Sequence, residues 1–350
     1  MTDLLPIRFG ENSQFATPSF DNLWLPLFGG EVLARFEENL ILLPLVETMT
    51  ISTGTTYKFP RLWQGEAERH PAGAEMLGLD IEMGEIEISI DSRPIVHHQV
   101  LDDIDLKMSH FEIRSKLATE SGRAIARAVD KNVARLLLNT SRTLKPAFGP
   151  FPGGGNDENG TAYIDAALAA DGVPSSAASR AAAGALIKAM DNAVVKFEDR
   201  NIPDGDRACV VRPNLWHALR VFGVPITTAE MYGAGATAGP FWQQPGLGMQ
   251  APARGNPPRD SFLEYNGVRI YRSPNMGNEN VTSGPTRYQG NFLNSIGVVF
   301  HKAAMAYLQM MGMETESERS TRHLADFVVS SHLGGGGALR PEACIELKTS

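Results

Sequence analysis

The strongest constraint on the fold of this chain is an unusually long helical pattern that begins near Ser109. Ser109 and Glu112 form a capping box, in which each side chain satisfies a backbone N–H group at the start of a helix. About 30 residues at ~1.5 Å each give a rod of ~45 Å, which is long for a helix of a globular protein. We therefore expect a helix that acts as a strut. Its apolar stripe recurs every four residues or a multiple of four, at Ile113, Leu117, Ile125, Val129, Val133 and Leu137.

Two segments with strand character precede this helix. Thr48–Phe59 is rich in Thr, Ile, Tyr and Phe, and Glu85–Val100 opens with strict alternation of isoleucine and polar residues. Residues 61–84, between them, are polar and contain glycine. The pattern predicts a long hairpin with an irregular tip. Because an isolated two-stranded hairpin is marginally stable in water, its apolar face must rest on the rest of the chain or on a neighbouring copy.

The remaining segments predict a mixed α+β fold. Residues 1–26 hold three prolines without periodicity, which indicates an extended arm, and Leu27–Leu40 reads as a short helix. Residues 303–322 fit a helix or a strand equally well. The other expected elements are a helix near Arg180–Arg200, a strand at Arg207–Val211, a helix from Pro213, and strands at Val268–Tyr271, Ile296–His301, Ala325–Ser331 and Ala343–Lys348.

Composition excludes several classes of protein. The chain has 32 Lys and Arg against 40 Asp and Glu, a net charge of −8, and no polybasic tail. This balance argues against broad adhesion to nucleic acid, but it is compatible with enclosing nucleic acid. No apolar run approaches the ~20 residues of a membrane helix, and the first residues lack the features of a signal peptide. Two cysteines, Cys209 and Cys344, argue against a disulfide scaffold.

A run of four glycines, Gly334–Gly337, raises the question of a nucleotide site. A phosphate-binding loop needs a Lys followed by Ser or Thr and then a helix. Here Arg340 and Pro341 follow, and the proline disfavours helical geometry at the residue before it. We therefore expect the glycines to form a flexible joint between two strands.

No combination of residues indicates catalysis. The best metal candidate is the pair His97 and His98, with Asp102, Asp103 and Asp105 nearby. Adjacent residues of a strand point to opposite faces, so both histidines cannot easily bind one ion. The sequence lacks the metalloprotease, hydrolase-elbow and Cys-x-x-Cys motifs. We therefore predict no catalytic residue, no metal site and no cofactor.

Four stretches carry a resemblance to a known family. They are Leu27–Leu33, Asp103–Ser115, Gly297–Ala304 and Gly335–Ala343. In order and spacing they resemble the major capsid proteins of short-tailed phages of the T7 group, which have the Hong Kong 97 (HK97)-type fold. The resemblance implies four parts, namely an N-arm at 1–47, an E-loop hairpin at 48–105 that lies over an adjacent subunit, a peripheral domain with the long spine helix at 106–144 and 303–322, and an axial domain with a mixed sheet at 145–302 and 323–350.

The function that this resemblance implies is that of a major head protein. It would self-assemble into pentamers and hexamers of an icosahedral shell around phage double-stranded DNA, without binding DNA sequence-specifically. The protein would be made in the host bacterial cytoplasm and reside in the virion. Since only residues 1–26 precede the first matching stretch, a separate scaffolding protein is expected. The other implied partners are a portal protein at one vertex and a cement or decoration protein, but no membrane.

The resemblance also points to residues at contacts between subunits. Lys58 could serve an isopeptide bond of the kind some related shells use, but Met311–His323 contains no Asn to receive it, so a non-covalent shell is expected. The glycines Gly334, Gly335, Gly336 and Gly337 would act as a hinge in the axial domain. The expected inter-subunit residues of the E-loop and spine helix are Lys58, Arg61, Trp63, Glu66, Glu68, Arg69, Ile86, Ile88 and Arg114.

Two alternatives remain open on the sequence alone. An encapsulin-like cellular compartment has the same fold and would be a closed shell that holds protein cargo. A metal-dependent enzyme would use the acidic and histidine cluster near residue 100.

Overall fold

The computed structural model describes residues 20–62, 67, 69–70, 83–102, 113–143, 162–164, 177–222, 263–277, 279–320 and 325–349. The chain divides into two compact units. Unit 1 comprises Met1–Leu40, Asp91–Asp130 and Gln309–Gly334, and unit 2 comprises Ile41–Ile90, Lys131–Leu308 and Gly335–Ser350. Within the described ranges, no helix is both long enough and apolar enough to cross a membrane.

The predicted long helix is confirmed as α3, Ile113–Ser141, with 29 residues. Its apolar stripe is buried as expected, since Ile125, Val129, Val133 and Leu137 are at most 1% exposed. The proposed cap at Ser109 and Glu112 lies outside the described residues. The first part of α3 belongs to unit 1 and the remainder to unit 2.

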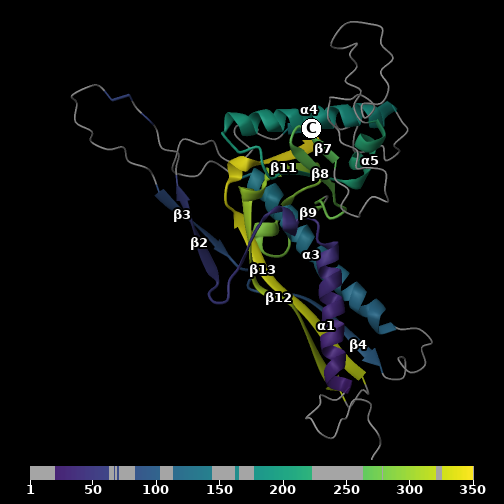
Figure 1. Cartoon of the computed structure of the whole chain (residues 1–350). Coiled ribbons are helices and arrows are strands. Elements are labelled where there is room, and N and C mark those ends of the chain that lie inside the picture. The colour runs from purple at the N-terminus through teal and green to yellow at the C-terminus, as the bar shows by residue number, and fades with distance from the viewer. Residues whose placement is uncertain are drawn as a thin grey trace, which may run out of the picture. The chain divides into compact units, whose positions relative to one another are not determined.

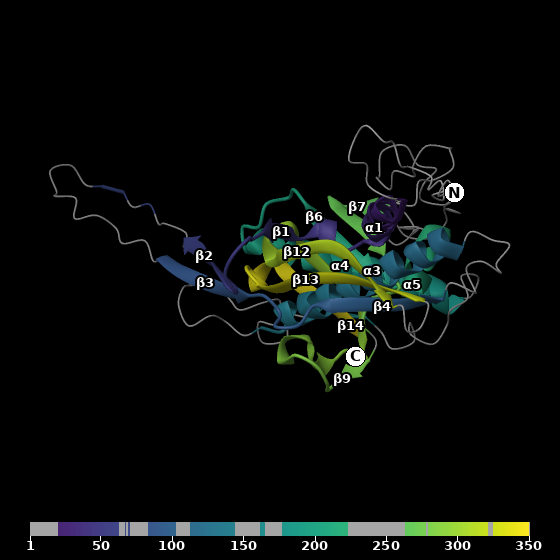
Figure 2. The same ribbon diagram turned by 90° about the horizontal axis from the view of Figure 1, so that it is seen from below.

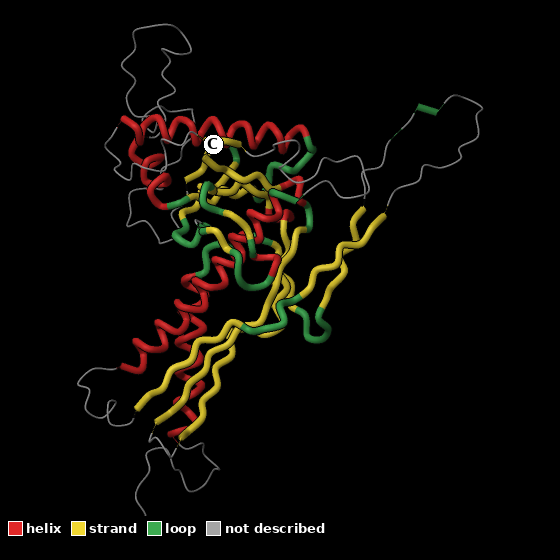
Figure 3. Tube along the Cα trace, turned by 180° about the vertical axis from the view of Figure 1, so that it is seen from behind, coloured by secondary structure: helices red, strands yellow, loops and turns green. Residues whose placement is uncertain are grey.

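Unit 1 consists of two helices against one face of a sheet. Helix α1, Phe20–Asn39, and the first part of α3 lie along β4 (Ile95–Asp102), β13 (Ala325–Ala338) and β12 (Met305–Ser320) (Figure 3). A Cβ on Gly122 of α3 would lie 2.6 Å from the carbonyl oxygen of Val32, so glycine lets the two helices approach closely. The buried core of this layer comprises Phe28, Val32, Leu101, Ala118 and Val328.

The extended-arm prediction is wrong for residues 20–26, because α1 already begins at Phe20. Pro26 removes only one backbone hydrogen bond, and the helix continues through it. Burial of Phe28, Val32 and Phe36 at helical spacing supplies the stabilisation that overrides the proline.

Unit 2 is built on a six-stranded sheet with the order β5-β14-β11-β6-β8-β7. Strand β11 pairs antiparallel with β14 and β6, whereas β6 pairs parallel with β8. All five residues of β6 are buried, which is typical of a strand covered on both faces. Helices α4 (Ala177–Asp199) and α5 (Pro213–Phe222) pack beside this sheet (Figure 1). The strands are β5 (Ala162–Ile164), β14 (Cys344–Thr349), β11 (Ser295–His301), β6 (Arg207–Val211), β8 (Val268–Arg272) and β7 (Leu263–Tyr265).

Short elements complete the described part of the chain. Strand β1 adjoins β12 in a sheet with the order β1-β12-β13-β4, and β9 pairs with β10. Both cysteines are buried and form no disulfide, as expected. The short elements are η1 (Leu43–Leu45), β1 (Glu47–Thr50), β9 (Asn280–Val281), η4 (Thr286–Tyr288), β10 (Gly290–Asn291), η5 (Lys302–Ala304) and η6 (Pro341–Ala343).

The predicted hairpin is confirmed in part. Strands β2 (Thr56–Leu62) and β3 (Met83–Ser89) pair antiparallel (Figure 2). Glu85–Val100 is not one strand, however. The chain turns before Pro94, which cannot donate a backbone hydrogen bond, and β4 then pairs with β13 instead.

Two further expectations concern the end of the chain. The ambiguous segment at 303–322 forms the 16-residue strand β12 after the short η5. The expectation that Gly334–Gly337 form a joint between two strands is wrong, because all four glycines continue β13 as far as Ala338. Their φ angles lie outside the left-handed region that only glycine adopts readily, so the run does not turn the chain.

Candidate functional site

The β2–β3 hairpin has one apolar and one charged face. Phe59 lies directly opposite Ile86, and the rings of Tyr57 and Phe59 meet edge to face at 4.9 Å. These three side chains are only half-buried, whereas Lys58 and Glu85 on the other face are exposed. The hairpin therefore retains apolar surface that its own chain does not cover.

The charged face carries an ion pair between Lys58 and Glu85. The Lys58 ammonium donates to a Glu85 carboxylate oxygen at 2.7 Å, and each side chain is 62% exposed. This hydrogen bond, together with the negative charge of Glu85, raises the pKa of Lys58. Because water screens an exposed pair, it contributes little to holding the hairpin together.

The base of the hairpin is fixed to the rest of unit 2. The Arg287 guanidinium donates to the carbonyl oxygen and to the hydroxyl of Ser89, both at 2.6 Å. Ile88 is 3% exposed and packs against Gly337 of its own chain, where a Cβ would come within 3.3 Å of it. Little of the Ile88 side chain is left for a neighbouring copy.

Only some of the other predicted contact residues lie in the described part of the structure. Arg61 in β2 and Arg114 in α3 have described backbones, but their side chains lie outside the described part. Arg69 is exposed. Trp63, Glu66 and Glu68 lie outside the described residues, so their expected contacts between subunits stay a prediction.

The glycine run serves close packing within unit 2. A Cβ on Gly336 would lie 3.0 Å from the carbonyl oxygen of Ala306 and 3.0 Å from a methyl group of Leu136. Any larger residue would therefore push β13 away from β12 or from α3. The nucleotide-loop interpretation has no support in this geometry, because the glycines belong to a strand and only the three-residue 3-10 helix η6 and the strand β14 follow them in the described part of the chain.

Sequence reasoning missed a buried ionic clamp at the end of α3. The Glu346 carboxylate of β14 is 0% exposed and accepts hydrogen bonds from Arg142 at 2.5 and 2.8 Å and from the hydroxyl of Ser295. The Arg142 guanidinium also lies over the Phe292 ring, 5.0 Å from its centroid. The available signal was a glutamate between Ile345 and Leu347 in the final strand, since a buried charge requires a partner.

The histidine cluster does not form a metal centre within the described ranges. His97 is half-buried and the adjacent His98 is exposed, with the His98 ring 5.9 Å from that of Phe327. Burial lowers the pKa of His97. Among the residues with a described position, no three His, Cys, Asp or Glu side chains are grouped so that they could hold a metal ion. Asp103 and Asp105 lie outside these ranges.

Comparison with known proteins identifies the family. The family model described as Gp10A-like major capsid protein matches residues 58–238, just over half of the chain. The chain belongs to this family. The capsid protein is 23% identical over 339 residues to the major capsid protein of Escherichia phage T7, covering 92% of this chain and 90% of the relative.

Solved phage capsids support the same fold for this capsid protein. The capsid of cyanophage P-SCSP1u superposes with a TM-score of 0.65 at 26% identity, covering 87% of this chain and 86% of the other. The mature capsid of bacteriophage PhiM1 has a TM-score of 0.63 at 16% identity, with 89% and 87% covered. The predicted α+β, HK97-like fold is therefore confirmed.

The same comparisons decide between the alternatives. The family and its relatives are phage capsid proteins, which favours the major head protein over an encapsulin-like compartment. The family is one of structural capsid proteins, so the comparisons give no support to the enzyme interpretation of the cluster near residue 100.

Proposed function

We propose that this capsid protein assembles with copies of itself into pentamers and hexamers of a closed icosahedral shell around phage double-stranded DNA. The observation that carries the proposal is the agreement of nearly the whole fold, 87% of the chain, with a solved phage capsid. The net charge of −8 suits a container that does not adhere to its DNA.

The parts of the chain receive roles on the same basis. We assign an N-arm to 1–47, a peripheral domain to 106–144 and 303–322, and an axial domain to 145–302 and 323–350. The E-loop, expected at 48–105, is best ended at Ile90, because β4 pairs with β13 and belongs to unit 1.

The hairpin supplies the contacts between neighbouring copies. Its half-buried Tyr57, Phe59 and Ile86 retain apolar surface that an adjacent subunit would bury. Ile88 contributes mainly within its own chain. The other residues proposed for contacts between copies are Lys58, Arg61, Trp63, Glu66, Glu68 and Arg69 of the E-loop and Arg114 of α3.

A hinge role for Gly334–Gly337 is compatible with their place in a strand. The boundary between the two units falls between Gly334 and Gly335. We propose that small changes of twist in β13 at this point fit one sequence to five-fold and six-fold environments. Gly335→Ala combined with Gly336→Ala should then reduce assembly, and an unchanged yield of shells would remove the hinge.

The shell is held without covalent links between subunits. The reason is that Met311–His323 contains no Asn that could receive Lys58. A separate scaffolding protein, a portal protein and a cement or decoration protein complete the assembly in the host bacterial cytoplasm. A ladder of oligomers that survives boiling detergent would contradict the non-covalent shell.

Electron microscopy of the purified protein, expressed alone and with its scaffolding protein, tests the function. Closed icosahedral particles are expected, and their contents separate a DNA container from a compartment for protein cargo. A well-behaved 38.0 kDa monomer in both preparations would contradict the shell.

A further inference from the structure

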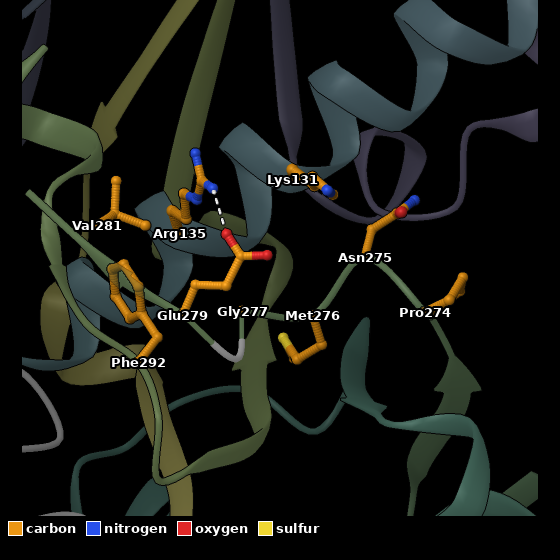
Figure 4. Close-up of a pocket in the computed structure, with 9 residues that line it drawn as sticks. All are labelled: Lys131, Arg135, Pro274, Asn275, Met276, Gly277, Glu279, Val281 and Phe292. Carbon is orange, nitrogen blue, oxygen red and sulfur yellow. Dashed lines mark ion pairs between the residues drawn. The ribbon is translucent and has the colours of Figure 1, made fainter. Parts of the chain in front are cut away.

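Unit 2 contains a cavity of about 110 Å³ beside the second part of α3 (Figure 4). Lys131 and Arg135 of α3 form one side, and the loop that includes Asn275 and Met276 forms another. Glu279 and Phe292 close the remaining sides. The cavity is large enough to receive one side chain.

The floor of this cavity is apolar and preformed. Its accessible apolar surface comes from the half-buried Val281 and the exposed Pro274, because Phe292 and Met276 are only 0% and 4% exposed. Glycines hold the Phe292 ring in place, because a Cβ on Gly277 would lie 3.1 Å from its Cβ and one on Gly290 would lie 2.8 Å from its Cζ. This close packing leaves the ring behind the cavity little room to move.

The rim is cationic. Lys131 and Arg135 are one helical turn apart, ~6 Å along the axis. Lys131 is exposed. Arg135 faces Glu279 at 3.8 Å, which exceeds a normal hydrogen-bond distance, and Glu279 itself is 69% exposed. The ion pair between Glu279 and Arg135 is therefore weak. A carboxylate of another copy that approaches Arg135 more closely can replace Glu279.

The combination of rim and floor favours a protein carboxylate over a phosphate. A phosphate oxygen set against Val281 and Pro274 would lose water without gaining a hydrogen bond there. The two methylene groups of a glutamate side chain can cover that apolar floor while its carboxylate meets Lys131. The amide of Asn275, which also lines the cavity, can donate to the same carboxylate.

Strand β12 offers a matching row of glutamates. Glu314, Glu316 and Glu318 are all exposed and occupy alternate positions of the strand, so they share one face. Alternate residues of a strand lie ~6.8 Å apart, close to the ~6 Å between Lys131 and Arg135 along the helix.

We propose that the cavity of one copy receives this glutamate row from β12 of a second copy. The inference rests on the proposed function, since self-association is the interaction that a capsid protein requires. It adds a specific contact in which one glutamate enters the cavity and pairs with Lys131, while the next glutamate of the row pairs with Arg135 at the rim.

Charge exchange between copies tests the contact. Lys131→Glu alone and Glu316→Lys alone should each lower the yield of sedimenting shells about tenfold, because like charges then meet across the contact. The double variant should return most of the yield. Because the spacing does not fix the register, the exchange is repeated with Glu314→Lys and with Glu318→Lys. Absence of rescue in all three double variants would overturn the inference.

Two controls make the outcome specific. Lys188→Glu makes the same charge change at an exposed position of helix α4, outside the cavity, and should assemble like the wild type. An equal loss in Lys188→Glu would mean that net charge alone is responsible, and the contact would be abandoned. Glu279→Gln releases Arg135 and should lower the protein concentration at which shells form, whereas a rise would contradict the role of Arg135.

The failure of each proposal can be distinguished. Wild-type protein that forms no shells would contradict the proposed function. Wild-type shells without any rescue would overturn only the cavity contact. Circular dichroism of the unassembled single variants, expected to match the wild type, separates a lost contact from a lost fold.

Discussion

Two ion pairs of this protein have nearly the same length and different surroundings. Arg142 and Glu346 approach to 2.5 Å, with the Glu346 side chain 0% exposed, and Lys58 and Glu85 approach to 2.7 Å with both side chains 62% exposed. Three donor groups surround the buried carboxylate of Glu346. In the exposed pair, water can hydrogen-bond to both charged groups. The buried pair therefore helps to hold its own chain together, and the exposed pair is free to exchange partners with another copy.

The largest effect is expected when the buried pair is broken. Glu346→Gln keeps the shape but removes the charge that Arg142 needs. Because Arg142 is itself 27% exposed and can recruit water, we expect the free energy of unfolding to fall by about 3 kcal/mol, the lower end for a broken buried pair. Guanidinium unfolding of the unassembled protein measures this. If Glu346→Gln lowered the free energy of unfolding no more than the exposed control Glu87→Gln does, the buried and the exposed ion pair would not differ in their contribution to stability.

His332 extends the comparison to a buried group without charge. It is 0% exposed, its ring lies 5.4 Å from that of Phe36, and burial lowers its pKa to about 4. As the pH falls below 6.5, the unfolded chain takes up a proton that the folded chain refuses, so stability falls between pH 6.5 and pH 4. Between pH 7 and pH 4.5, the wild type should lose about 2 kcal/mol more than His332→Phe. Parallel losses in both proteins would show that His332 is not the group responsible.

The clamp also depends on the aromatic ring beneath Arg142. Gly290→Ala would place a Cβ 2.8 Å from Cζ of Phe292 and 3.1 Å from the side-chain oxygen of Asn139. We expect a loss of about 1 to 2 kcal/mol from this overpacking, measured by thermal unfolding. Gly184→Ala in α4 is the matched control, since no atom lies near its added Cβ and alanine favours the helix. A loss in the control as large as in Gly290→Ala would argue against overpacking.

The smallest effect is expected in the exposed pair. Lys58→Gln and Glu85→Gln should leave the unfolding midpoint of the unassembled protein unchanged, because water already screens both groups. Their effect should appear only in the yield of shells. If either variant unfolded as readily as Glu346→Gln, the Lys58–Glu85 pair would stabilise the fold of the single chain.

Local patterns in the sequence predicted the elements well, because their causes are local. The apolar residues from Ile125 to Leu137 recur every four positions, and this local pattern was enough to predict α3. The alternation around Ile86 predicted β3 in the same way. Pro26, in contrast, suggested an arm where α1 continues, because the burial of Phe28 and Val32 that outweighs it is tertiary.

Pairings between distant segments were beyond sequence reasoning. Val100 lies opposite Phe327 in the sheet, and the sequence around either residue does not predict this pairing. Position 336 requires glycine because Ala306 and Leu136 approach it closely. The run of four glycines in the sequence does not predict these neighbours. The partner of Glu346 likewise lies 204 positions earlier. In the candidate site, the hairpin could be predicted, but its attachment through Arg287 to Ser89 could not.

The place of β14 has a consequence for the synthesis of the protein. Cys344–Thr349 lies between β5 and β11 in the six-stranded sheet, so an early strand and a late strand meet only through it. Translation must therefore run almost to residue 349 before this sheet can close. A ribosome that stops short of Cys344 releases a chain with a gap inside the sheet, and such a chain exposes the flank of β11 to whatever binds unfolded polypeptides in the cell.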